Sequence, residues 1–151
     1  MRHKTMTRII FIYFPPRIMV IGGKLLLPCE VGVKTVLPAI KALLARTIVE
    51  KHGMKEKQAA EILGLSQSAI SRYVTKGRGN IITIENVAEV QTLIDQMAAF
   101  LMHKPDQKME ILKLFCQTCK IIREKGLMCR FCQQNKMHRT WVETCAFCRS
   151  T

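Results

Sequence analysis

The segment between residues 55 and 75 constrains the fold of this chain more than any other part of the sequence. It contains two short stretches with a helical spacing of apolar residues, separated by a turn at Gly64. Gly64 can adopt a positive φ angle, and Ser66 is a favourable N-cap for the second helix. Ala60 provides the small side chain that two steeply crossing helices need at their contact. The residues expected to face the shared core are Ile62, Leu63, Leu65, Ile70 and Val74.

Longer helices are expected on both sides of this pair. Apolar residues recur at three- and four-residue steps over residues 35–52, 84–103 and 108–125. In the first of these helices, Pro38 is expected in the first turn, where its missing N–H does little harm, and Gly53 is expected to end the helix. No tract shows a strict alternation of apolar and polar residues. The sequence therefore predicts a mainly α fold.

The composition indicates an anionic partner and gives no sign of a common enzyme class. The chain has 24 Lys and Arg residues against 11 Asp and Glu residues, a net charge of +13 and a pI near 9.8. It lacks GxGxxG, Walker and GxSxG signatures, so we expect neither an enzyme nor a small-molecule substrate. Aromatic residues are 6% of the chain, too few for a platform that stacks the bases of a single strand.

The second short helix and the loop after it carry the side chains that such a partner would contact. Glutamine suits adenine and arginine suits guanine in the major groove, whereas cations beyond the helix suit phosphates. A helical hairpin that serves only for packing is the alternative, but it would have no reason to place Arg72, Lys76 and Arg78 together. The candidate DNA-binding residues are Ser66, Gln67, Ser68, Ser71, Arg72, Thr75, Lys76 and Arg78.

Five short motifs carry resemblances to known proteins. Gln58-Ala-Ala60, Gly64-Leu-Ser66 and Ala69-Ile-Ser71 resemble the helix-turn-helix of phage-repressor-type, or Cro/C1-like, regulators. Leu27-Pro-Cys-Glu30 and Val36-Leu-Pro-Ala-Ile40 are similar to a family of predicted archaeal transcriptional regulators with variable, sometimes cysteine-rich, C-terminal parts. The resemblance covers about residues 25–104. It implies sequence-specific binding of double-stranded DNA by the second helix of the motif.

Seven cysteines are distributed very unevenly along the chain. Cys29 stands alone and is expected to be a small buried hydrophobic residue, whereas the other six form three Cys-x-x-Cys pairs near the C-terminus. Without a convincing secretion signal, paired cysteines favour a metal over disulfides. Four thiolates can hold zinc or an iron–sulfur cluster, and the cluster is narrowly favoured because the first pair lies on a helix face. The candidate metal ligands are Cys116, Cys119, Cys129 and Cys132, with Cys145 and Cys148 as further candidates.

The segment 104–106 interrupts the helical pattern and is the expected domain boundary. Residues 1–18 are then an N-terminal extension, residues 19–104 a helix-turn-helix domain, and residues 105–151 a small cysteine-rich metal-binding lobe. No apolar run approaches the roughly 20 residues that span a bilayer. We therefore expect a cytoplasmic protein without membrane contact.

The leading hypothesis is a homodimeric transcriptional regulator whose DNA affinity responds to a cysteine-bound centre that senses redox or iron–sulfur status. Three alternatives stay open. The centre can be a purely structural zinc, or the basic chain can bind RNA instead of DNA. A thiol–disulfide oxidoreductase is disfavoured, because redox Cys-x-x-Cys motifs lie at a helix start within a βαβ unit, a pattern missing from this sequence.

Overall fold

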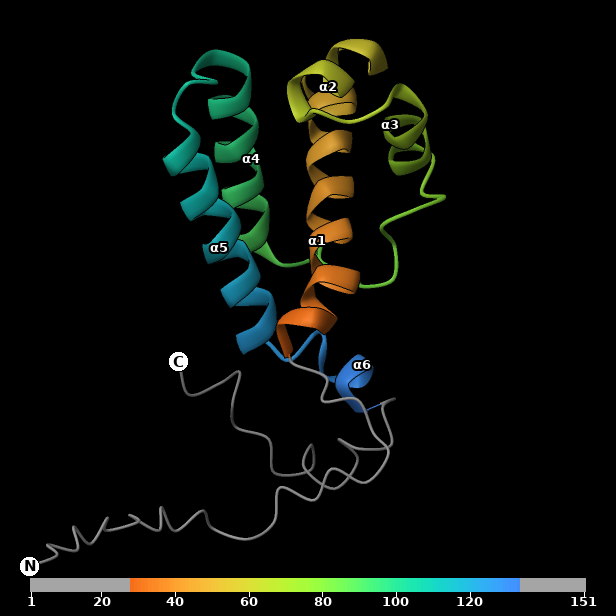
Figure 1. The fold of residues 1–151 in the computed structure, drawn as a ribbon, viewed down its shortest axis with the longest axis vertical. Helices are drawn as coiled ribbons and strands as arrows, with labels where there is room; N and C mark the ends of the chain where they lie inside the picture. The colour runs from red at the N-terminus through yellow and green to blue at the C-terminus, as the bar shows by residue number, and fades with distance from the viewer. Residues whose placement is uncertain (1–27, 134–151) are drawn as a thin grey trace, which may run out of the picture.

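A computed structural model describes residues 28–133, which fold around one long helix. This helix, α1 (Pro28–Arg46), continues into a π-helical turn at Thr47–Lys51. It stands between α3 on one side and the α4–α5 pair on the other (Figure 1). The remaining helices are α2 (Glu56–Leu63), α3 (Gln67–Val74), α4 (Ala88–His103), α5 (Lys108–Glu124) and α6 (Cys129–Gln133). The described residues contain no strand, as the sequence predicts.

The prediction of α1 was wrong at its N-terminal end. The helix begins at Pro28, and Pro38 lies in its interior, where it leaves one backbone carbonyl without its usual N–H donor. Burial on both sides compensates for this loss, since Val36, Ala39 and Ile40 are all at most 1% exposed. The C-terminal end is as expected, because Gly53 follows the last turn with a φ of +67°.

Helix α4 begins later than predicted. The helical pattern was expected from Ile84, but the helix starts at Ala88, which is exposed rather than part of the buried stripe. Ile82 and Ile84 are nevertheless buried, so the segment before α4 packs onto the core without being helical. The helical spacing of apolar residues therefore predicted correctly that Ile84 is buried, but wrongly that it is helical.

Helix α5 agrees with the prediction over nearly all its length, and Gly126 follows it with a φ of +68°. Its residues Leu114 and Ile122 belong to the same core cluster as α1 and α4, and so does Met128 beyond its end. The chain on both sides of the turn at 104–106 thus shares one core. The predicted extension 1–18 lies outside the described residues.

Candidate nucleic-acid interface

The turn between α2 and α3 has the geometry that its sequence predicts. Gly64 adopts φ +63° and ψ +36°, a left-handed conformation that a residue with a Cβ adopts only at an energetic cost. The N–H of Leu65 then donates to the carbonyl of Ala60 at 2.9 Å. Ser66 begins the next helix, and its Oγ accepts a hydrogen bond from the N–H of Ala69 at 3.2 Å. These contacts fix where α3 begins and the direction in which it leaves the turn.

One face of α3 is buried against α1 and α2. Ile70 is fully buried, as predicted, and Ala60 of α2 is 6% exposed. The other predicted core residues, Ile62, Leu63, Leu65 and Val74, are partly buried and pack against this core. Tyr73 is also buried at 4% exposure, although the sequence analysis did not single it out. Its spacing of three residues from Ile70 was the signal that could have identified it.

The opposite face of α3 is polar and turned outward. Ser66, Gln67, Ser68, Arg72 and Thr75 are exposed, and Ser71 is half-buried. Two of these side chains are steadied by the helix backbone, because Arg72 Nε donates to the Ser68 carbonyl at 3.1 Å and Thr75 Oγ1 donates to the Ser71 carbonyl at 2.8 Å. The Arg72 guanidinium has four further nitrogen-bound hydrogens, which can donate to an external acceptor.

The loop after α3 places two cations beside the end of this helix. Lys76 has a φ of +58°, and both Lys76 and Arg78 are exposed. The Arg78 N–H donates to the Arg72 carbonyl at 3.0 Å, and its guanidinium lies 5.8 Å from the centre of the Tyr73 ring. The predicted phosphate-binding side chains are therefore next to the predicted base-reading side chains.

Gly79 holds this loop close to α1. A Cβ at this position would lie 2.4 Å from the Ala42 Cβ and 2.7 Å from the Pro38 carbonyl oxygen, and the φ of Gly79 is +77°. Both the space and the backbone conformation thus require glycine here. The sequence predicted Lys76 and Arg78 as binding residues of this loop but gave no indication of the role of Gly79.

No three of the predicted metal ligands are grouped in the described part of the chain. Cys116 is exposed and Cys119 half-buried on α5, whereas Cys129 and Cys132 are half-buried on α6. Among residues 28–133, no three His, Cys, Asp or Glu side chains are grouped so that they could hold a metal ion. Cys145 and Cys148 lie outside the described residues. The metal site therefore remains a prediction from the sequence.

Cys29 differs from its prediction, because it is exposed rather than buried. It is the second residue of α1 and lines a mainly apolar pocket of about 260 Å³ between α1 and α5. Cys116, Cys119 and Phe115 line the same pocket from α5. The expectation failed because a helix that begins at Pro28 has its first turn at the edge of the bundle.

The structure thus contains a helix-turn-helix, in which the short helices α2 and α3 are joined by a left-handed turn and a polar face of α3 is turned outward. Residues 46–92, just under a third of the chain, match the family model described as Helix-turn-helix. This match supports a DNA-binding domain. The search of curated proteins and the search of solved structures return no match. No helix among the described residues is long and apolar enough to cross a membrane.

Proposed function

We propose that this protein is a transcriptional regulator that recognises a specific sequence of double-stranded DNA with the exposed face of α3. The observation that carries the proposal is the division of α3 into two faces. Ile70 and Tyr73 anchor one face in the core, which leaves Gln67 and Arg72 outside, with Lys76 and Arg78 beyond the helix. A helix held in this way can enter the major groove while the cations bind flanking phosphates.

Selection of bound duplexes from a random pool tests this proposal. The full chain is expected to enrich a defined sequence, and Gln67→Ala is expected to relax the base preference at one position within it. Gln96→Ala on α4 is the matched control, because Gln96 is equally a surface glutamine but lies on another helix. Competition by structured RNA distinguishes the alternative function. A preference for RNA, or the absence of any enriched duplex, would refute the proposal.

We also infer that the regulator acts as a homodimer joined through a surface that we name the α1–α5 face. This face comprises the apolar pocket between the two helices, which Val33 and Cys116 help to line, and the exposed residues Met109 and Leu112, which precede Cys116 on α5 at steps of three and four residues. The exposed fractions of Val33, Met109 and Leu112 are 62%, 66% and 56%, so these apolar side chains contact mostly water in the isolated chain. Contiguous apolar surface of this kind is typical of protein interfaces.

The position and the surroundings of the α1–α5 face favour a second copy of the chain. The face includes α5, which lies across α1 from α3 (Figure 1), so pairing through it leaves both DNA-reading helices accessible. Ion-paired residues flank the apolar stripe on α5, since Lys113 binds Glu110 at 2.7 Å and Lys120 lies 3.6 Å from Glu124. An apolar centre with a polar rim is the usual anatomy of an interface. A single helix of 8 residues reads only a short half-site, which a second copy would complete.

The oligomeric state in solution tests this surface. The full chain is expected to sediment as a dimer, and Leu112→Gln is expected to shift the equilibrium toward monomer. Ile81→Gln is the control, because Ile81 is also an exposed apolar residue, 47% exposed, but lies in the loop before α4. A wild-type monomer at high concentration, or equal dissociation of both variants, would contradict the proposed surface.

The proposed regulatory part, a cysteine-bound iron–sulfur cluster or zinc ion, is supported only by the three Cys-x-x-Cys pairs. An absorption spectrum and the metal content of anaerobically purified protein distinguish a coloured cluster from colourless zinc. DNA affinity with and without the metal, measured at one salt concentration, then tests sensing. Equal affinities would exclude regulation by the metal, but they would not contradict the proposal that the protein binds DNA.

A further inference from the structure

A buried arginine links α1 to the end of the DNA-reading helix. Arg46 is the last residue of α1, and its side chain is only 8% exposed. One terminal nitrogen of its guanidinium donates to the backbone carbonyl of Tyr73 at 3.3 Å. Carbonyls in the last turn of a helix lack partners within the helix, and a cation near them is favourable. Arg46 therefore holds the C-terminal end of α3 against α1.

Glu85 neutralises this buried cation. Its Oε1 accepts a hydrogen bond from the second terminal nitrogen of Arg46. A charge with so little exposure needs such a partner, because removing it from water is otherwise very unfavourable. Glu85 itself comes from the segment that leads into α4, so the ion pair connects that segment with α1 and, through Arg46, with α3.

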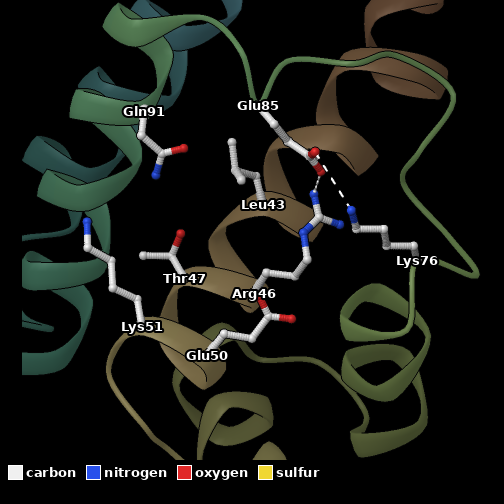
Figure 2. A pocket seen from close by; sticks show the side chains of 8 residues that line it. All are labelled: Leu43, Arg46, Thr47, Glu50, Lys51, Lys76, Glu85 and Gln91. Atoms are coloured by element: carbon white, nitrogen blue, oxygen red, sulfur yellow. Dashed lines mark hydrogen bonds and ion pairs between the residues drawn. The ribbon is translucent and has the colours of Figure 1, made fainter.

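The same carboxylate also approaches one of the predicted phosphate-binding cations. Glu85 Oε2 lies 4.0 Å from Lys76 Nζ. Figure 2 marks this ion pair between the two side chains with a dashed line. These charges line a pocket of about 300 Å³ between the end of α1, the start of α4 and the loop after α3. Lys76 is 64% exposed, so DNA can reach its ammonium group, whereas Arg46 is too deeply buried to bind a phosphate directly.

We propose that Glu85 is a positioning residue for DNA recognition, because its one carboxylate holds Arg46 against the end of α3 and restrains Lys76. This inference rests on the proposed function. The two contacts have opposite effects on DNA binding. The Arg46 contact orients α3 and thereby favours the specific sequence, whereas the Lys76 contact must be broken by a phosphate of any sequence.

The substitution Glu85→Gln separates these effects, because it keeps the size of the side chain and an oxygen acceptor but removes the charge. The probes are the best duplex selected with the wild-type chain and a scrambled duplex of the same composition. Affinity for the scrambled duplex is expected to rise by up to about fivefold, the range of an exposed ion pair. The ratio of specific to non-specific affinity is expected to fall, because α3 is less firmly oriented, whereas release of Lys76 strengthens both complexes alike.

Two further variants test whether the effect of Glu85→Gln comes from the contacts of this carboxylate. Glu89→Gln removes the same charge from an exposed residue of α4 that pairs with Lys125 at 2.8 Å, and it is expected to leave the affinity ratio unchanged. Adding Lys76→Met to Glu85→Gln is expected to abolish the gain on the scrambled duplex. A merely structural role would lower both affinities together, in proportion to the folded fraction measured by circular dichroism.

If Glu85→Gln does not fold, single variants of the exposed cations test the same idea. Lys76→Met is expected to lose less affinity for the scrambled duplex than Arg78→Met, because Lys76 must first leave Glu85. The inference is overturned by equal losses in these two variants, or by an unchanged affinity ratio in a folded Glu85→Gln variant. If the wild-type chain binds no duplex at all, the proposed function has failed instead.

Discussion

Arg72 and Arg78 carry the same charge, yet their surroundings assign them to different parts of a DNA duplex. Arg72 extends from the outward face of α3, where its guanidinium can reach base edges. Arg78 follows the helix and lies beside the Tyr73 ring, which suits a phosphate next to the groove. Substitutions at the two positions should therefore differ in whether they change the sequence preference, and also in how much DNA affinity they remove.

Arg72→Ala is expected to lower the affinity for the selected duplex by about 1–3 kcal/mol and to relax the preference at one base pair. Arg78→Ala or Lys76→Ala should instead weaken binding to all sequences alike, and should reduce the slope of log affinity against log salt by about one unit each. Fluorescence anisotropy over a series of salt concentrations measures both quantities. An equal loss of sequence preference in all three variants would contradict these assignments.

Gly79 shows how closely the loop after α3 is packed. Gly79→Ala would place a Cβ 2.4 Å from the Ala42 Cβ at a φ of +77°, so we expect a loss of unfolding free energy of about 1–3 kcal/mol. Gly77→Ala is the matched control two residues away, since the nearest atom to its Cβ would be 3.6 Å distant. Thermal unfolding compares the two variants. Similar melting temperatures would mean that the loop does not depend on this close approach.

At the scale of the element, α3 is too short to be stable alone. Its 8 residues make few hydrogen bonds of their own, and isolated helices of this length do not persist in water. The cap at Ser66 and the buried side chain of Ile70 therefore supply much of what keeps it folded.

Substitutions at these two positions should have effects of clearly different size. Ile70→Ala is expected to lower the free energy of unfolding by about 2–5 kcal/mol, because it removes a fully buried side chain. Ser66→Ala should lower it by about 1 kcal/mol, the usual contribution of an N-cap. Urea denaturation of each variant measures the difference. A larger effect at Ser66 than at Ile70 would show that packing is not the main support of α3.

The sequence predicted α2, α3 and the turn between them well, because Gly64 and Ser66 act within a few residues of their own position. Prediction from the sequence failed where packing between segments distant in the chain decides the local structure. Pro38 is a local signal for the start of a helix, yet burial of α1 on two sides keeps the helix continuous through it. The interaction of Arg46 with Glu85 spans 39 residues, and no local pattern in the sequence indicates it.

At the scale of the whole molecule, the described residues separate two kinds of surface. Exposed polar and basic side chains lie on α3 and in the loop after it, whereas exposed apolar side chains gather on the α1–α5 face. The sequence identified the polar surface from residue types alone. It could not predict that Met109 and Leu112, which have core-like spacing, are exposed, because periodicity shows that a face is apolar but not what covers it.

Titration of the ¹⁵N-labelled full chain with the selected duplex, followed by amide chemical shifts, tests most directly which surface binds DNA. The account predicts that the largest shifts occur along residues 66–78, from Ser66 through α3 to Arg78, while the exposed residues of α5 change little. Shifts concentrated on α5 or α6, or no shifts with any duplex, would contradict it.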